Sequence, residues 1–213
     1  MKGKIEKDLR TKGLVCAGVD EVGKGCLAGP VFAGCVVLDF PKLLSHPNTQ
    51  LKLLRDSKTL SSQQRSRLLP FIAEVSIAHS VAESSVEEIE TLGLQKATYL
   101  AMQRAIDSLK LCFDILLIDG RHTLPNYPHP QMAIIKGDAL CYSIAAASII
   151  AKEARDEIMR KEAKKHPFYG FENHVGYATS QHQKALMKLG ACALHRKNFA
   201  PVRKALETPY VDR

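Results

Sequence analysis

Two adjacent carboxylates, Asp20 and Glu21, stand at the end of a short apolar run and directly before a glycine-rich loop. The apolar run, residues 14–19, is too short for a helix and is typical of a buried strand. Ionised carboxylates are costly to remove from water unless they are paired or bind a cation, and only Lys24 lies nearby in sequence. We therefore expect these two acids either to face solvent or to hold a metal ion.

Asp119 and Asp138 stand at comparable points further along the chain. Asp119 ends a largely apolar run, residues 113–118, which is typical of a strand buried on both faces, and the carboxyl ends of such strands bind ligands in α/β sheets. Asp138 precedes the most helical stretch, residues 139–165, where an N-cap role explains it. If one sheet joins these segments, the crowded carboxylates must bind cations or be protonated more readily. Oxygen ligands without Cys or His favour magnesium or manganese over zinc.

The loop after Glu21 also fits two generic phosphate-binding motifs. Residues 18–25 have the spacing of a P-loop, except that Gly25 stands where a Ser or Thr would hold magnesium. The glycines match a dinucleotide-binding fingerprint as well, but that motif opens a helix, whereas the β-branched residues over 31–38 predict a strand. A hairpin with solvated acids at its turn is the third interpretation, and the loop by itself does not exclude it.

The other elements that must position these residues are predicted from periodicity and helix caps. Residues 39–54, which contain two prolines, are expected to be a loop, and Ser61 with Gln64 forms a capping box. The remaining predicted elements are a helix over 61–69, a strand over 74–83, a helix from Ser85 to Gly93 with Glu88 in its cap, a helix over 94–110, strands over 113–119 and 132–135, and a helix over 139–165.

Composition limits the class of protein. The chain has 213 residues, of which 46% are hydrophobic and 24% charged, the balance of an ordinary globular domain. No secretory signal is visible, and the longest apolar stretch, residues 144–151, is too short to span a bilayer, so we expect a cytoplasmic protein. The six cysteines have neither disulfide-like nor zinc-like spacing and indicate reduced, buried side chains.

Positive charge is concentrated near the C-terminus. The net charge is +8, and residues 164–206 contain eight Lys or Arg against one acid, a local +7, with aromatic residues and four histidines between them. A solvated face is one explanation of such a block, and a surface for a polyanion is the other. A basic segment together with an acidic cluster suggests a phosphodiester substrate held against bound metal.

Residues 19–30, VDEVGKGCLAGP, resemble the N-terminal signature of ribonuclease HII, and the residues after Asp-Glu distinguish it from ribonuclease HIII. The resemblance extends from Val15 to about Leu206. Val175 and Asn198 depart from it, since they stand where Lys and Ser are common. Its other motifs are DSK at 56–58, KGD at 136–138 with SIAAASIIAKEARD at 143–156, HPFYGFENHVGYATSQH at 166–182 and HRKNFAPV at 195–202.

This resemblance implies an α/β, ribonuclease H-like fold, in which helices flank a central mixed five-stranded sheet whose first three strands are antiparallel. It implies a single domain, with a catalytic core over about 14–165 and a basic helical C-terminal extension over about 166–213 that contributes to substrate binding. The implied enzyme is an endonuclease that hydrolyses the RNA strand of RNA–DNA hybrids and cuts 5′ of ribonucleotides embedded in duplex DNA. It leaves 5′-phosphate and 3′-hydroxyl ends, serves ribonucleotide and primer removal, and is expected to be a monomer.

The resemblance also assigns roles to residues. Two Mn²⁺ or Mg²⁺ ions are implied during catalysis, with Asp20 bridging them and with ligands at Asp20, Glu21, Asp119 and Asp138. Tyr177 is expected to pack against the sugar at the junction between ribonucleotide and deoxyribonucleotide, although a core aromatic is the alternative. The residues implied in substrate binding are Gly23, Lys24, Gly25, Ser57, Lys58, Tyr177, Lys184 and Arg196.

Two other functions are compatible with parts of the sequence. A nucleic-acid-binding protein without activity would use the basic segment, but four carboxylates without metal would repel a phosphate backbone. A ribonuclease H-fold nuclease for DNA structures such as junctions would keep the acids but would not need the glycine loop or Tyr177. A duplex with a single ribonucleotide separates these alternatives.

Overall fold

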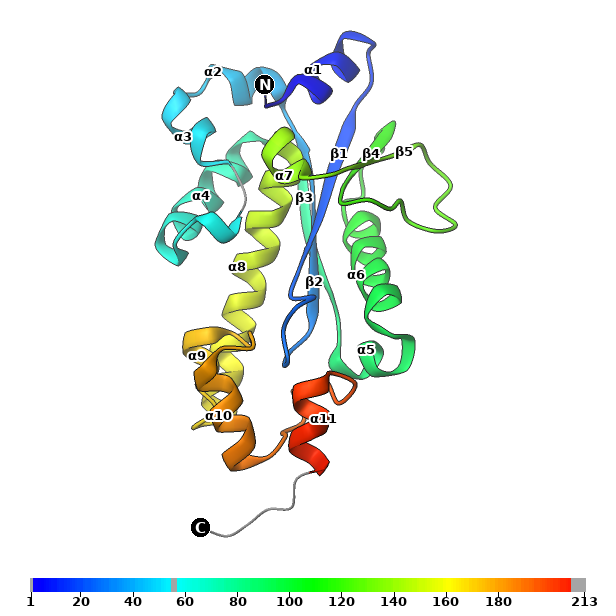
Figure 1. The fold of residues 1–213 in the computed structure, drawn as a ribbon. Helices are drawn as coiled ribbons and strands as arrows, with labels where there is room; N and C mark the ends of the chain where they lie inside the picture. Colours follow the sequence, from blue (N-terminus) through cyan, green and yellow to red (C-terminus); the bar gives the residue numbers. More distant parts are fainter. Residues whose placement is uncertain (1, 55–56, 208–213) are drawn as a thin grey trace.

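The computed structural model describes residues 2–54 and 57–207, in which helices flank a five-stranded mixed sheet (Figure 1). The spatial order of the strands is β3-β2-β1-β4-β5. The first three strands are antiparallel neighbours, whereas β4 pairs parallel with both β1 and β5, which confirms the predicted architecture. The strands are β1 (Cys16–Val22), β2 (Val31–Leu38), β3 (Ser76–Ser84), β4 (Ile115–Asp119) and β5 (Gln131–Ile134).

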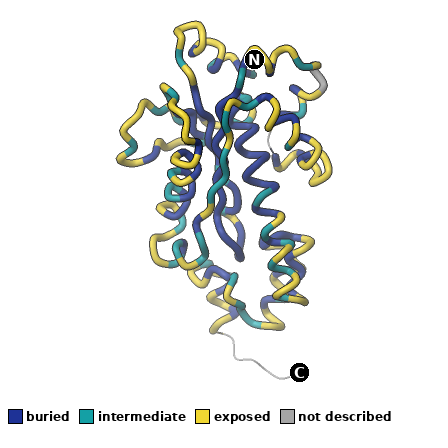
Figure 2. Tube along the Cα trace, turned by 180° about the vertical axis from the view of Figure 1, so that it is seen from behind, coloured by how far each residue is buried: buried dark blue, intermediate teal, exposed yellow. Residues whose placement is uncertain are grey.

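One long helix covers each face of the sheet. Helix α8 packs on β1 and β2 with α4 beside it, and α6 packs on the opposite face against β2 and β3 (Figure 1). The tube in Figure 2 shows the central strands and the upper half of α8 as the most buried part of the chain. The helices are α1 (Lys4–Thr11), α2 (Phe40–Ser45), α3 (Asn48–Leu53), α4 (Ser62–Val75), α5 (Val86–Leu92), α6 (Leu94–Ser108), α7 (Gly137–Leu140), α8 (Tyr142–Lys165), α9 (Phe171–His174), α10 (Ser180–Leu189) and α11 (Ala200–Glu207), with a 3-10 turn at Ser57–Thr59.

Small residues let α8 lie close to β1, which carries Asp20 and Glu21, and to its neighbour β2. A Cβ atom at Gly18 of β1 would lie 2.5 Å from the backbone of Ser143 and Ile144, and one at Gly34 of β2 would meet the carbonyl of Ala147. Because real Cβ atoms do not approach backbone so closely, glycine is required at both positions. The sequence of these strands therefore fixes the distance between the sheet and α8.

Two regions differ from the sequence-based expectation because of prolines. Residues 39–54 were expected to be a loop, but they form α2 and α3, in which Pro41 lies in the first turn of α2 and Pro47 is the N-cap of α3. Proline is well suited to the start of a helix, where its missing N–H has no partner to lose. The helix expected to end near residue 69 continues as α4 to Val75 through Pro70, since its later turns bury Phe71 and Ile72.

The helix predicted over 139–165 is broken. Cys141 is extended, so a short α7 containing Asp138 precedes α8, and Asp138 does not cap the long helix. The cap comes instead from α1, a helix that the sequence patterns did not predict. The buried carboxylate of Glu6 accepts hydrogen bonds from the backbone N–H of Tyr142 (3.0 Å) and Ser143 (2.7 Å) and from the Ser143 hydroxyl.

The C-terminal helices gather at one end of the sheet, beneath the loop between β1 and β2 (Figure 1). Isolated bridges join this loop to them, from Cys26 to Tyr177 and from Ala28 to His195. The division of the chain into a core and an extension stays a prediction. Across residues 2–54 and 57–207, no helix is both long enough and apolar enough to cross a membrane.

Candidate active site

Strand β1 carries both Asp20 and Glu21 inside its length rather than beyond its end. Asp20 is 5% exposed, and its carboxylate accepts the backbone N–H of Glu21 at 2.7 Å and a hydrogen bond from Ser148 of α8. Glu21 is partly exposed and pairs with Lys24, whose Nζ lies 3.0 Å from Glu21 Oε1. The turn interpretation is therefore wrong, because the acids belong to a central strand and Asp20 is buried beneath α8.

The pairing of β1 with β4 brings Asp119 beside Asp20. Val19 is paired with Ile118 in the parallel register, so the next residues along the two strands are Asp20 and Asp119. Asp119 Oδ1 accepts the N–H of Gly137 at 2.7 Å, and the backbone amide of Asp138 also donates to Asp119. Gly137 therefore anchors α7 to β4, and Asp138 is the next residue. The segments that carry Asp20 with Glu21, Asp119 and Asp138 meet at this point.

The charges at this point are poorly compensated by the protein. Burial first, and then the neighbouring Glu21 and Asp119, raise the pKa of Asp20 well above its ordinary value. Burial and Glu21 also raise the pKa of Asp119, against the amides of Gly137 and Asp138 and the charge of Lys58, which lower it. Hard carboxylate oxygens that repel one another are suited to a divalent cation such as Mg²⁺ or Mn²⁺.

Within the described residues, no three His, Cys, Asp or Glu side chains are already arranged to hold an ion. The Glu21–Lys24 ion pair accounts for part of this, because a cation at Glu21 must compete with Lys24 for the same carboxylate. The donor set thus fits a hard divalent ion in chemistry, and such an ion would displace Lys24 from Glu21.

Two buried arginines hold the loop between β1 and β2. Arg155 of α8 donates from Nη2 to Ala28 O (3.0 Å) and from Nε to Pro30 O (3.0 Å). Arg196, fully buried, donates to Gly29 O from Nε (2.9 Å) and Nη2 (2.7 Å) and to Lys24 O from Nη1 (3.1 Å). Backbone carbonyls therefore occupy both guanidinium groups, and these arginines shape the loop from inside.

The glycines of this loop have different surroundings. Gly23 has a φ of +94°, which favours glycine, and a Cβ there would meet the Arg155 side chain. Gly25 is exposed, and no atom lies within 4 Å of a Cβ built on it. Open backbone for a substrate is therefore present at Gly25, whereas Gly23 supports the turn and the Lys24 carbonyl is held by Arg196.

Ser57 and Lys58 lie behind and beside the acids. The Ser57 side chain is buried, with its Oγ 2.9 Å from Ser148 Oγ, so a Ser57–Ser148–Asp20 chain of hydrogen bonds reaches the site. Lys58 lies near the acids, and its positive charge lowers the pKa of Asp119. Asp56, the first residue of the DSK motif, lies outside the described residues.

Sequence comparison identifies the family. A family model described as Ribonuclease HII matches residues 17–202. The chain belongs to the ribonuclease HII family. It is 48% identical over 190 residues to ribonuclease HII 1 of Methylibium petroleiphilum, which covers 89% of this chain and 92% of that protein. The predicted family, the fold and the class of enzyme, a ribonuclease that acts on the RNA of RNA–DNA hybrids, are thereby confirmed.

Solved structures with the same fold are more distant in sequence. Ribonuclease H2 from Pyrococcus horikoshii OT3 superimposes with a TM-score of 0.74 at 24% identity and covers 91% of this chain and 98% of its own. Bst-RNase HIII, solved in complex with Mn²⁺, gives a TM-score of 0.70 at 22% identity over 91% of this chain and 69% of that one. At these identities the comparison shows that the fold is shared with ribonuclease HII and HIII proteins.

Tyr177 lies partly exposed between the loop and α8. Lys152 Nζ lies 5.1 Å from the centre of its ring, and the ring borders a hollow of about 800 Å³. Basic groups contribute much of the lining, including Lys58, Arg65 and Arg160. Lys184 is exposed on α10 and stays a predicted substrate contact, as does Arg196, although its burial favours a supporting role.

Sequence reasoning missed Arg155 as a residue that supports the loop of the candidate site. It lies on the polar half of α8 together with Lys152 and Asp156, and such a half is usually solvated. All three side chains are buried: Asp156 pairs with Arg65 of α4 at 2.9 Å and with Lys152 at 2.6 Å, and Arg155 donates to the loop carbonyls. The accumulation of charged residues of both signs on one helical face was the available indication.

Proposed function

We propose, for this endonuclease of RNA–DNA hybrids, a cleavage that uses two divalent ions held by Asp20, Glu21, Asp119 and Asp138. The observation that carries the proposal is the position of Asp20 and Asp119 directly after the paired residues Val19 and Ile118 of adjacent parallel strands, where the charge of Asp119 raises the pKa of Asp20. Bound Mn²⁺ or Mg²⁺ would supply an activated water and stabilise the leaving oxygen of the phosphodiester. Asp20, which is affected by the charges of both Glu21 and Asp119, would be a ligand to both ions.

The residues around the acids hold them in place. Ser148 and the amide of Glu21 orient the Asp20 carboxylate, and the amide of Gly137 orients that of Asp119. Fixed hydrogen bonds of this kind limit how far a carboxylate must move to bind an ion. Lys58 contributes positive charge on the same side, which favours the approach of a phosphate.

We further propose that the enzyme cuts 5′ of a ribonucleotide in duplex DNA and leaves 5′-phosphate and 3′-hydroxyl ends. The 2′-hydroxyl is the group that distinguishes RNA from DNA, and reading it requires backbone free of side chains together with a surface for the sugar. Gly25 provides the first and the ring of Tyr177 the second. We propose a cytoplasmic monomer that removes ribonucleotides and primers from DNA.

The test is cleavage of a duplex DNA that contains one ribonucleotide, with Mg²⁺, Mn²⁺ or EDTA in parallel. We expect one cut on the 5′ side of the ribonucleotide with either ion, no cut with EDTA, and no cut in the same duplex made of DNA alone. Cleavage of an all-DNA junction would favour the structure-specific nuclease instead. Tight binding without any cut would favour the binding protein.

A further inference from the structure

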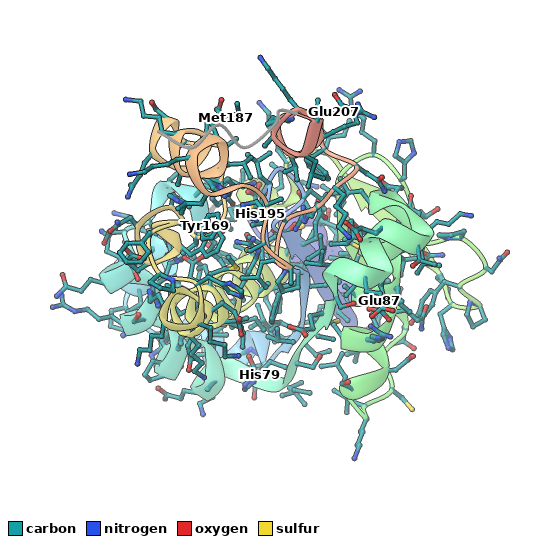
Figure 3. The ribbon with its side chains drawn as sticks, turned by 90° about the horizontal axis from the view of Figure 1, so that it is seen from below. His79, Glu87, Tyr169, Met187, His195 and Glu207 are labelled. Carbon is teal, nitrogen blue, oxygen red and sulfur yellow. The ribbon has the colours of Figure 1, made fainter. Side chains whose placement is uncertain are left out.

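Three buried histidines form a connected cluster directly behind the backbone of Tyr177. His174 ends α9, His182 lies in α10 and His195 precedes α11, with exposures of 6%, 0% and 1%. The Nε2 atoms of His182 and His195 are 3.1 Å apart, and the rings of His174 and His182 stack with centres 4.3 Å apart. Figure 3 shows His195 beside Tyr169 between the C-terminal helices, and their ring centres are 5.1 Å apart.

The hydrogen-bond partners assign the protons of His182 and His195. His182 Nδ1 lies 2.8 Å from the carbonyl oxygen of Tyr177, which only accepts, so Nδ1 carries the proton. His182 Nε2 must then accept, and the facing His195 Nε2 donates to it. His195 Nδ1 accepts in turn from the backbone N–H of Cys192 at 3.0 Å. One tautomer of each ring satisfies every partner, and both rings are neutral.

His174 is assigned in the same way. Its Nε2 lies 2.9 Å from the carbonyl oxygen of Tyr169 and must donate, while its Nδ1 accepts the backbone N–H of Gly176 at 3.2 Å. All six ring nitrogens of the cluster are therefore used by three neutral imidazoles. An added proton on any ring would set two donors against each other.

The cluster fixes a segment of strained backbone. Val175 has a φ of +44°, which is unusual for a β-branched residue, and Gly176 follows at +90°. The Tyr177 N–H donates to the carbonyl of His174 at 2.9 Å, and the Tyr177 carbonyl accepts from His182. Strained backbone persists where its surroundings over-determine it, and such sites are frequent near function.

We propose that His182, oriented by His195 and supported by His174, is a positioning residue that fixes the Tyr177 backbone and thereby the place of its ring over the ribonucleotide sugar. The proposal rests on the proposed function of Tyr177. The histidines touch no substrate themselves; they act through Tyr177. The Tyr177 carbonyl accepts from His182 Nδ1 and also from the backbone N–H of Thr179 at 2.8 Å, so His182 is the side-chain anchor of this backbone and its loss shifts the ring.

The surroundings of the cluster favour the neutral rings. In the described part of the chain, the titratable groups around it include the His166 ring, the Tyr169 ring and the Cys192 thiol, with Glu162 near Cys192. Burial lowers the pKa of His182, and burial together with His182 lowers the pKa of His195 to about 4. Positive charge on these rings is therefore disfavoured at neutral pH.

A matched pair of variants tests the role of His182. In His182→Asn the amide N–H replaces the Nδ1 donor to Tyr177, whereas in His182→Gln the polar atoms reach the Nε2 end and that donor is lost. We expect His182→Gln to cleave a single embedded ribonucleotide roughly tenfold or more slowly than His182→Asn at similar melting temperature. In a Tyr177→Ala background the two should be equal. Equal rates in the wild-type background, or a difference that persists without Tyr177, would overturn the positioning role.

A readout without substrate separates this proposal from the proposed function. Nitrogen NMR of the ¹⁵N-histidine-labelled wild-type chain at pH 7 should show the proton of His182 on Nδ1 and the protons of His174 and His195 on Nε2. A chain that cuts the single-ribonucleotide duplex but carries the His182 proton on Nε2 overturns the positioning role. A chain with the expected tautomers that does not cut this duplex overturns the proposed function, while the arrangement of the cluster stands.

Discussion

At the scale of single residues, Asp20 combines burial with two negative neighbours. Asp20→Asn should reduce cleavage by at least about a hundredfold, because a neutral amide is a poor ligand for a hard cation. Binding of a hybrid should be unchanged or tighter, since one negative charge facing phosphate is removed. Cleavage and fluorescence-anisotropy titrations on the same hybrid measure both effects.

Asp8→Asn provides the matched control for this variant. Asp8 lies exposed on α1 and pairs with Lys4 at 2.7 Å, so the substitution makes the same chemical change away from the acids. It should leave turnover and binding at wild-type values. Full turnover by Asp20→Asn with added metal would contradict the metal-binding site.

Tyr177 is the second residue whose role can be isolated. Tyr177→Ala should slow cleavage of a single embedded ribonucleotide far more than cleavage of a long hybrid. In the first substrate only one sugar distinguishes RNA from DNA, whereas a long hybrid offers many. Tyr177→Phe keeps the ring and should remain near the wild-type rate. If Tyr177→Ala slows both substrates equally and also lowers the melting temperature strongly, the ring is a structural anchor.

At the scale of elements, α1 determines how α8 begins. Glu6 is 1% exposed and serves as the cap of a helix more than 130 residues away, so Glu6→Ala should lower the free energy of unfolding by about 2 kcal/mol. Lys7→Ala on the exposed side of the same helix should change it by less than about 0.5 kcal/mol. Urea unfolding of both variants measures the difference, and equal stabilities would contradict the capping role.

The histidine cluster makes the packing of the C-terminal helices sensitive to acid. The pKa of His195 is about 4 in the folded chain and about 6.5 when unfolded, so the unfolded state takes up the proton first. The stability that this group contributes is present above pH 6.5 and is lost as the pH falls toward 4. The loss is about 3 kcal/mol.

His195→Gln is the control, because Gln retains a donor toward His182 but does not titrate. Urea unfolding at pH 7 and pH 4.5 should show a larger loss of stability for the wild type than for this variant. Parallel curves for the two proteins would mean that other groups cause the acid sensitivity.

Elements whose ends are set by residues close in sequence were predicted correctly, and those set by distant residues were missed. The capping boxes of Ser61 with Gln64 and of Ser85 with Glu88 were predicted correctly, because both partners lie three residues apart. The bounds of β2 were also predicted correctly, because the signal for its start, a glycine-proline pair, directly precedes it. The break at Cys141 was missed, because the cap of α8 comes from the other end of the chain.

The candidate site divides in the same way. The acids and Tyr177 follow from motifs that lie in continuous sequence, whereas the inward orientation of Arg196 and Ser57 depends on what packs around them. His182 and His195 were counted only as part of a basic segment, since histidine in sequence does not reveal its tautomer or its partners. Burial, which arises from the whole fold, decided these cases.

At the scale of the whole molecule, exposed lysines lie at both ends, and only those on α10 are proposed to contact the substrate. Lys184 and Lys188 are exposed on α10, at the end opposite to α1 (Figure 1). Changing both to Glu should weaken hybrid binding and flatten its salt dependence, by ~0.9 in the log-log slope for each phosphate of B-form DNA that is no longer neutralised. Measurement of the hybrid affinity at salt concentrations from about 50 to 300 mM tests this prediction.

The control changes the same charge at the other end. Lys7 and Lys12 are exposed on and after α1, and their replacement by Glu alters the net charge equally. This double variant should keep the wild-type salt slope. Equal slopes for both double variants would mean that Lys184 and Lys188 form only a solvated helix face.

The parallel pairing of β1 with β4 also determines when a growing chain becomes an enzyme. Asp20 leaves the ribosome early, but Asp119 follows 99 residues later, and α8, which buries Asp20, ends only at Lys165. At about 5–20 residues per second, roughly 7 to 29 seconds separate the synthesis of the first acid from that of the end of the helix that covers it. A nascent chain that ends before residue 138 lacks the last of the four acids, so the proposed metal site is complete only in the second half of synthesis.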